Sequence, residues 1–100
     1  MLNQGLFITA EIRIKPETDL HTGINAIHAF CEGMNSESGC SMAIALQDTQ
    51  DPYRFVFWER YDDKAAFEAH FNAQHTQTFI QSGLTELVQA FESQKLLKED

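Results

Sequence analysis

Several features that would place this chain in a functional class are scarce or missing. Seven lysines and arginines stand against fifteen aspartates and glutamates, which gives a net charge of −8. Such a surface repels nucleic acid phosphates and anionic lipids, so neither is an expected partner. No apolar run approaches the roughly 20 residues that span a bilayer, and the first residues lack the basic start and cleavage site of a signal peptide. We therefore expect a cytoplasmic protein without membrane contact.

Cysteine and the common cofactor motifs are also nearly absent. The two cysteines, Cys31 and Cys40, fit no disulfide framework and no metal-site spacing, and we interpret both as structural. None of the four histidines lies in a zinc-binding motif, and no glycine-rich nucleotide loop or nucleophilic serine elbow occurs. We expect neither a metal nor any other cofactor.

The remaining composition is that of an ordinary globular protein. The chain has 100 residues, of which 43% are hydrophobic and 22% are charged. That length is typical of one domain, and we expect a single domain over residues 1–100 that is ordered nearly to its ends.

Hydrophobic periodicity predicts four strands and two helical regions. The first helix is expected to begin at Thr18 or Asp19 and to bury a stripe formed by Leu20, Ile24, Ile27, Cys31 and Met34. The second region is expected to begin at Asp62 or Asp63 and to end at Gly83. The predicted segments are a strand at 6–14, the first helix, a strand from 42, a strand at 53–61, helical stretches at 64–72 and 76–81, and a last strand within 87–97. This order, βαββαβ, predicts an α+β fold with a ferredoxin-like antiparallel sheet.

The third strand is apolar on both faces, with Phe55 and Phe57 on one and Val56 and Trp58 on the other. Helices cover only one face of a ferredoxin-like sheet, so the other face needs a second cover. A symmetric partner sheet is the simplest one, and the pattern therefore predicts a homodimer.

Candidate catalytic groups cluster after this strand. Glu59 and Tyr61 share one of its faces, and His70 and His75 follow in the helical segment. Imidazole has an unperturbed pKa of about 6.5, which suits proton transfer near neutral pH, and a carboxylate partner would fix its tautomer. The alternative is a buried hydrogen bond from Glu59 to a histidine that only ties helix to strand.

Two further groups of residues allow a functional or a structural interpretation. Trp58, Phe55, Phe57 and Tyr61 can line a cavity for a planar aromatic ligand, or can simply pack in a core or a dimer interface. His21 and His28 flank the apolar stripe of the first helix without an acidic third ligand, and we expect them to be solvated or partly packed.

The segment from Phe57 to His70, followed by His75 and Phe79, resembles the antibiotic biosynthesis monooxygenase (ABM) family. That family shows a glutamate, an aromatic residue two positions on, an acidic helix start and one or two histidines, which correspond here to Glu59, Tyr61, Asp62, His70 and His75. The resemblance extends to Gly39, to the segment 46–48 and to Arg54-Phe55, and so covers most of the chain. It implies a dimeric α+β barrel, in which two ferredoxin-like sheets close on each other.

The family includes cofactor-free monooxygenases of quinols and polyketide phenols, autoinducer-2-degrading isomerases and haem-degrading enzymes. The haem-degrading branch fits least, because Ala10, His70 and Ile80 stand where it has a strand asparagine, a pocket tryptophan and a histidine ligand. The resemblance implies a cofactor-independent monooxygenase that oxidises a small quinol or phenolic aromatic with O2. The alternatives are an isomerase or degrading enzyme for a small oxygenated signalling metabolite, and a non-catalytic ligand-binding dimer.

Each candidate residue has a role in the monooxygenase hypothesis. His70 or His75 is the base, and Glu59 orients it. Tyr61 donates a hydrogen bond to a substrate oxygen, and the pocket wall is formed by Trp58, Phe57 and Phe55.

Overall fold

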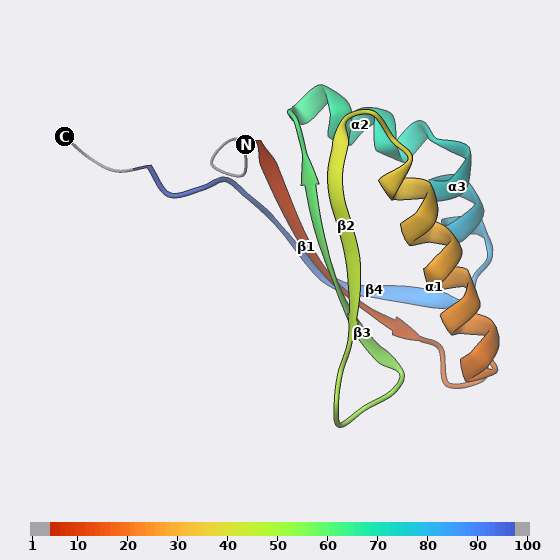
Figure 1. The fold of residues 1–100 in the computed structure, drawn as a ribbon. Coiled ribbons are helices and arrows are strands. Elements are labelled where there is room, and N and C mark those ends of the chain that lie inside the picture. Colours follow the sequence, from red (N-terminus) through yellow and green to blue (C-terminus); the bar gives the residue numbers. More distant parts are fainter. Residues whose placement is uncertain (1–4, 98–100) are drawn as a thin grey trace.

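The computed structural model describes residues 5–97; the expectations for the two chain ends, at 1–4 and 98–100, lie outside the described residues. Within residues 5–97, four strands and three helices follow one another (Figure 1). They are β1 (Leu6–Ile14), α1 (Leu20–Asn35), β2 (Cys40–Gln47), β3 (Arg54–Tyr61), α2 (Lys64–Asn72), α3 (Gln74–Gln81) and β4 (Thr85–Ser93).

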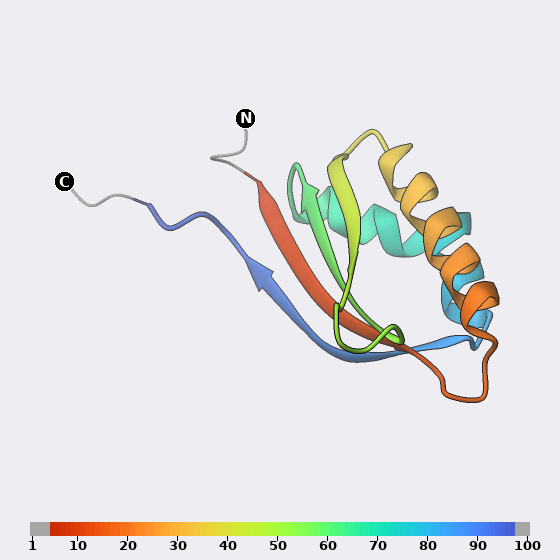
Figure 2. The same ribbon diagram turned by 60° about the horizontal axis from the view of Figure 1, so that its bottom comes forward.

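The strands form one antiparallel sheet in the order β2-β3-β1-β4. All three helices lie on one face of this sheet, and the opposite face is open (Figure 2). This arrangement confirms the predicted α+β, ferredoxin-like class. Among residues 5–97, no helix has the length and apolar character that crossing a membrane would require.

Strand alternation places the core between the sheet and the helices. In β1, Ile8, Ile12 and Ile14 point to the helices and are buried, as predicted for this strand. The register of β1 with β3 sets Ile12 opposite Phe55 and Ile8 opposite Glu59. The same face therefore carries an apolar core at one end and a buried carboxylate at the other.

Both main helices begin at capping aspartates. The Asp19 side chain accepts a hydrogen bond from the backbone N–H of Thr22 (3.0 Å), and Asp63 accepts one from Ala66 (2.8 Å). The predicted stripe of α1 faces the core, but Phe30, which was not assigned to it, is among the buried residues of this helix. Phe30 stacks on Phe79 of α3, with ring centroids 4.3 Å apart, and so joins the two helices.

Three predicted boundaries were wrong by a few residues. β2 begins at Cys40 rather than Met42, and α3 begins at Gln74 rather than Thr76. β4 begins at Thr85, two residues after Gly83 (φ 70°), and a register shift against β1 disturbs its alternation. Leu96, considered for this strand, lies beyond it and is exposed.

The open face of the sheet is apolar at its centre. Ile44 and Leu46 of β2, Trp58 of β3 and Phe91 of β4 lie on it, each with 41–56% of its surface exposed. We refer to these four residues as the open-face patch. The predicted homodimer, which would cover this patch, stays a prediction.

Candidate active site

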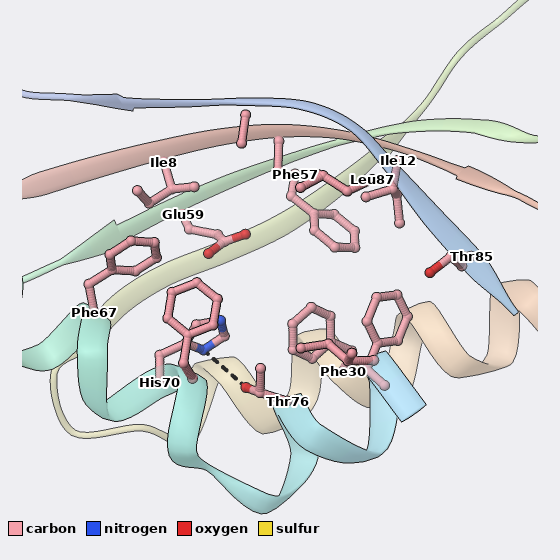
Figure 3. Close-up of a pocket in the computed structure, with 15 residues that line it drawn as sticks. Ile8, Ile12, Phe30, Phe57, Glu59, Phe67, His70, Thr76, Thr85 and Leu87 are labelled. Atoms are coloured by element: carbon pink, nitrogen blue, oxygen red, sulfur yellow. Dashed lines mark hydrogen bonds between the residues drawn. The ribbon is translucent and has the colours of Figure 1, made fainter. Parts of the chain in front are cut away.

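A pocket of about 280 Å³ lies between the sheet and helices α2 and α3 (Figure 3). Another protein's apolar cavity of about 150 Å³ holds benzene, so this one suits a molecule of one or two aromatic rings. Its wall is mostly apolar. The lining residues are Ile8, Ala10, Ile12, Phe30, Phe57, Glu59, Phe67, His70, Phe71, Thr76, Phe79, Ile80, Thr85, Leu87 and Ala90.

Glu59 brings a carboxyl group into this apolar wall. Tyr61 lies two residues further along β3, on the same face, and its hydroxyl donates a hydrogen bond to Oε1 of Glu59 (2.7 Å). Burial raises the pKa of Glu59, and the Tyr61 hydrogen bond and nearby His70 only partly offset this effect. Burial, followed by the negative charge of Glu59, raises the pKa of Tyr61, which keeps its proton and acts as a donor.

His70 faces Glu59 from the last turn of α2, but its hydrogen-bond partner is a different carboxylate. Nδ1 of His70 lies 2.9 Å from Oε2 of Glu37, and Nε2 of His75 contacts the same oxygen. Glu37 stands in the turn between α1 and β2, where its N–H donates to the carbonyl of Met34 and its carbonyl accepts from Cys40. Three segments of the chain therefore meet at one carboxylate oxygen.

This contact defines the protonation of the His70 ring. An ionised carboxylate can only accept hydrogen bonds, so each imidazole nitrogen that contacts Glu37 carries a proton and donates it. A neutral His70 then has its proton on Nδ1 and a lone pair on Nε2. Figure 3 shows this second nitrogen on the cavity side of the ring, toward Glu59. The wall of one pocket thus carries both a proton acceptor and a carboxyl group.

Aromatic packing holds the His70 ring in place. The ring is stacked parallel to Phe67, and the rings of Tyr61 and Phe30 lie 5.2 and 5.7 Å away. Thr76, fully buried, places its hydroxyl 3.3 Å from Nδ1. Among residues 5–97, no buried side-chain polar atom lacks a hydrogen-bond partner, so these groups form a satisfied network rather than a strained one.

Comparison with known proteins identifies the family. The antibiotic biosynthesis monooxygenase model matches residues 6–82, which is most of the chain and includes Glu37, Glu59, His70 and His75. The chain belongs to the antibiotic biosynthesis monooxygenase family. No curated protein matches the sequence.

Solved structures of similar proteins share the ABM-family fold. Protein YJCS is 25% identical, with a TM-score of 0.81 over 91% of this chain and 98% of its own. A Pseudomonas aeruginosa protein is 24% identical, with a TM-score of 0.82 over 97% and 99% of the two chains. A Bacteroides thetaiotaomicron protein described as a possible oxidoreductase is 19% identical, with a TM-score of 0.77 over 91% and 99%.

The structure brings together some of the residues expected from the ABM resemblance and separates others. Glu59, His70 and Phe57 line the pocket, and Tyr61 lies behind Glu59. His75 does not line the pocket but joins His70 through Glu37. The orienting partner of the histidines is therefore Glu37, not Glu59 as expected.

The other two expected pocket residues lie elsewhere. Phe55 is buried in the core beyond the pocket, and Trp58 points to the open face, because neighbouring residues of a strand alternate between faces. Trp58 borders a shallow hollow there with Leu46 and Val56. His21 and His28 are exposed on α1, as expected.

The interpretation of both cysteines as structural agrees with their surroundings. Cys31 and Cys40 are free thiols. Burial raises the pKa of Cys31 to about 11 and also raises that of Cys40. Since the thiolate is the reactive form, neither side chain has the character of a nucleophile at neutral pH.

No sequence signal pointed to Glu37. It is separated from His70 by 33 residues and from His75 by 38, in a segment rich in glycine, serine and asparagine that predicts only a loop. The one local hint is Gly33, where a Cβ atom would overlap the His75 ring. This glycine allows α3 to approach α1 closely enough for the histidine to reach Glu37.

Proposed function

We propose that this ABM-family protein is a cofactor-independent monooxygenase that oxidises a small quinol or phenol with O2. One observation carries the proposal. His70 lies in the wall of an apolar pocket, with one ring nitrogen held by Glu37 and the other directed to the cavity beside Glu59. This is the arrangement of a general base whose tautomer is fixed by a carboxylate.

The pocket supports binding of an aromatic substrate. Phe30, Phe57 and Phe79 form a wall against which a planar ring can pack, as aromatic pairs do in protein cores. A substrate hydroxyl directed to the polar side of the pocket meets Nε2 of His70. Transfer of its proton to His70 leaves an electron-rich phenolate in a site with few competing waters.

The phenolate then reduces O2, and the substrate supplies the electrons. For a quinol, one oxygen atom of O2 forms a bond to a ring carbon and the other leaves as water, while the ring is oxidised to a hydroxyquinone. The quinol contributes both hydrogens of the water, one of them through His70. Atoms and electrons balance without a flavin, a haem or an external reductant.

Glu59 suits this chemistry when it carries its proton. Burial raises its pKa and favours the protonated carboxyl, which donates a hydrogen bond as well as accepting the one from Tyr61. A neutral acid beside the developing phenolate stabilises the negative charge, whereas a second carboxylate would repel it.

The same pair of groups also favours a second candidate, an isomerase that acts on a small oxygenated metabolite. A base and a neutral acid that face one cavity can move a proton between two carbon or oxygen atoms without oxygen. Turnover under strict anaerobiosis distinguishes the isomerase from the monooxygenase. An unaltered ligand after prolonged incubation indicates the third alternative, a dimer that binds without catalysis.

We also propose that the protein forms a homodimer, in which the open-face patches of two copies pack against each other. Support comes from the exposure of Ile44, Leu46, Trp58 and Phe91 on the open face of the sheet, which a second copy of the sheet would bury. The partners of this proposal are thus a small aromatic or oxygenated metabolite and a second copy of the chain.

Oxygen consumption with a panel of reduced quinols and polyhydroxylated aromatics, corrected for autoxidation, tests the function. His70→Gln should lower the saturable rate by roughly 10²–10⁴-fold, the usual contribution of a general base. The matched control is His28→Gln, the same substitution at an exposed histidine on α1, which should leave the rate unchanged. Uptake no faster than autoxidation across the panel, or equal rates in wild type and His70→Gln, would refute the proposal.

A further inference from the structure

The cluster that joins α1, α2 and α3 has the composition of a metal site. Oε2 of Glu37, Nδ1 of His70 and Nε2 of His75 all lie within 4.8 Å of one another. We infer that these three side chains bind a divalent first-row transition metal such as Zn²⁺ or Co²⁺. This inference goes beyond the proposed function and does not depend on it.

The donor set fits this class of ion. Two imidazoles and one carboxylate ligate zinc in hydrolytic enzymes and iron in oxygenases, whereas Mg²⁺ and Ca²⁺ prefer sites made of oxygen atoms. Chain spacing gave no such prediction, because Glu37 lies far from both histidines in the sequence. The site exists only after folding brings the three segments together.

The distances also fit, with a small adjustment. Ligands around a tetrahedral metal at bond lengths of about 2.0–2.1 Å lie about 3.3 Å apart. The Glu37–His70 pair is at 2.9 Å, a hydrogen-bond distance, and the Glu37–His75 pair is shorter still. Replacing the two shared protons by one ion requires these groups to move apart by about 0.5 Å or somewhat more. His75 and Glu37 can do so because neither is fully enclosed.

The surroundings provide both access and a second coordination shell. The side chain of His75 is 24% exposed and that of Glu37 is 12% exposed, against 5% for His70, so an ion enters past His75. Thr76 Oγ1, 3.3 Å from Nδ1 of His70, can support the ligand set or give way to a water. When Nδ1 binds the metal, the His70 proton moves to Nε2, on the cavity side of the ring.

Binding has two consequences that can be measured separately. A doubly protonated imidazole has no lone pair to give to an ion, so affinity falls as the pH is lowered. Occupation also places a proton on Nε2 of His70, so it should suppress the activity proposed above. The second consequence rests on that proposed function, and the first does not.

Titration of the purified protein with Co²⁺, without any substrate, tests the site through the visible absorption of low-coordinate Co²⁺. We expect one ion per chain, displaced by Zn²⁺, and an affinity on the order of 100-fold lower in Glu37→Gln and in His75→Ala. The matched controls are Glu32→Gln and the His21→Ala/His28→Ala double variant, at exposed positions of α1. They should bind as the wild type does.

A second measurement needs no substitution and therefore no assumption about folding. Zn²⁺ should shift the ring resonances of His70 and His75 in the NMR spectrum and leave those of His21 and His28 in place. Absence of a Co²⁺ band, equal affinity in Glu37→Gln and wild type, or shifts confined to His21 and His28 would overturn the inference. None of these outcomes bears on whether the metal-free protein consumes oxygen.

Discussion

The two faces of the sheet handle polar groups in opposite ways. On the helix-covered face, Glu59 and His70 are buried, yet both have hydrogen-bond partners. On the open face, charged side chains gather at the end near the β2–β3 hairpin, where Arg54 pairs with Glu11 at 2.7 Å and with Asp48 at 2.9 Å. The centre of that face carries the apolar open-face patch.

This difference indicates two separate roles for one sheet. Burying ionisable groups costs free energy even when they have partners, so their presence on the covered face points to chemistry rather than stability. An exposed apolar surface points instead to association. The covered face is thus the candidate active site, and the open face is the candidate dimer interface.

Among the further variants that compare the two faces, the largest effect is expected from a charge placed on the open face. Trp58→Glu would bury a carboxylate in the proposed dimer interface, and the affinity of the proposed dimer should fall by roughly 10²–10³-fold, the effect of losing a central aromatic anchor. Light scattering over a concentration series measures this change. Asn25→Glu adds the same charge to the exposed surface of α1 and should leave the mass unchanged. If Trp58→Glu is as dimeric as the wild type, the open-face patch is not the dimer interface.

A smaller effect is expected from removing the carboxylate that holds His70 on the covered face. Glu37→Gln keeps the shape of the side chain but removes the charge that holds His70, and kcat for oxygen uptake should fall by roughly 10–100-fold with little change in KM. Glu32→Gln, exposed on α1, is the matched control. Steady-state oxygen electrode kinetics measure both constants. Loss of substrate affinity alone would assign Glu37 to binding instead of positioning.

The smallest effect concerns the pH dependence of stability. Burial raises the pKa of Glu59, so the folded protein binds its proton more tightly than the unfolded chain does. The free energy of unfolding is therefore highest while Glu59 is protonated, and it falls as the pH rises through the folded-state pKa. Glu59→Gln, which can still accept the Tyr61 hydrogen bond, should lose that dependence. Urea unfolding should show the variant gaining stability relative to wild type between pH 4 and pH 8. If the difference in free energy of unfolding between the two proteins is constant over this pH range, burial does not raise the pKa of Glu59.

Local patterns along the chain predicted most of the fold. Alternation defined β1 to the residue, and Asp19 and Asp63 were among the expected helix caps. The last strand was harder to predict, since its register shift breaks the two-residue period and its side chains stay exposed.

The candidate site was less accessible to sequence reasoning. Phe57, Glu59 and His70 could be found because they lie within one strand and the helix that follows it. Trp58 was assigned to the pocket although its neighbour Phe57 takes the inward position, which the alternation of the strand already implied. Glu37 could not be found, because its role depends on how the α1–β2 turn packs against α2 and α3.

The central claim is that Glu37 fixes the His70 ring so that Nε2 faces the pocket as a proton acceptor. Nitrogen NMR of the histidine rings, recorded with a chelator at a pH where His70 is neutral, tests it most directly. We expect a proton on Nδ1 and a bare Nε2 for His70 in the wild type, and loss of that preference in Glu37→Gln. A proton on Nε2 in the wild type, unchanged by the substitution, would contradict it.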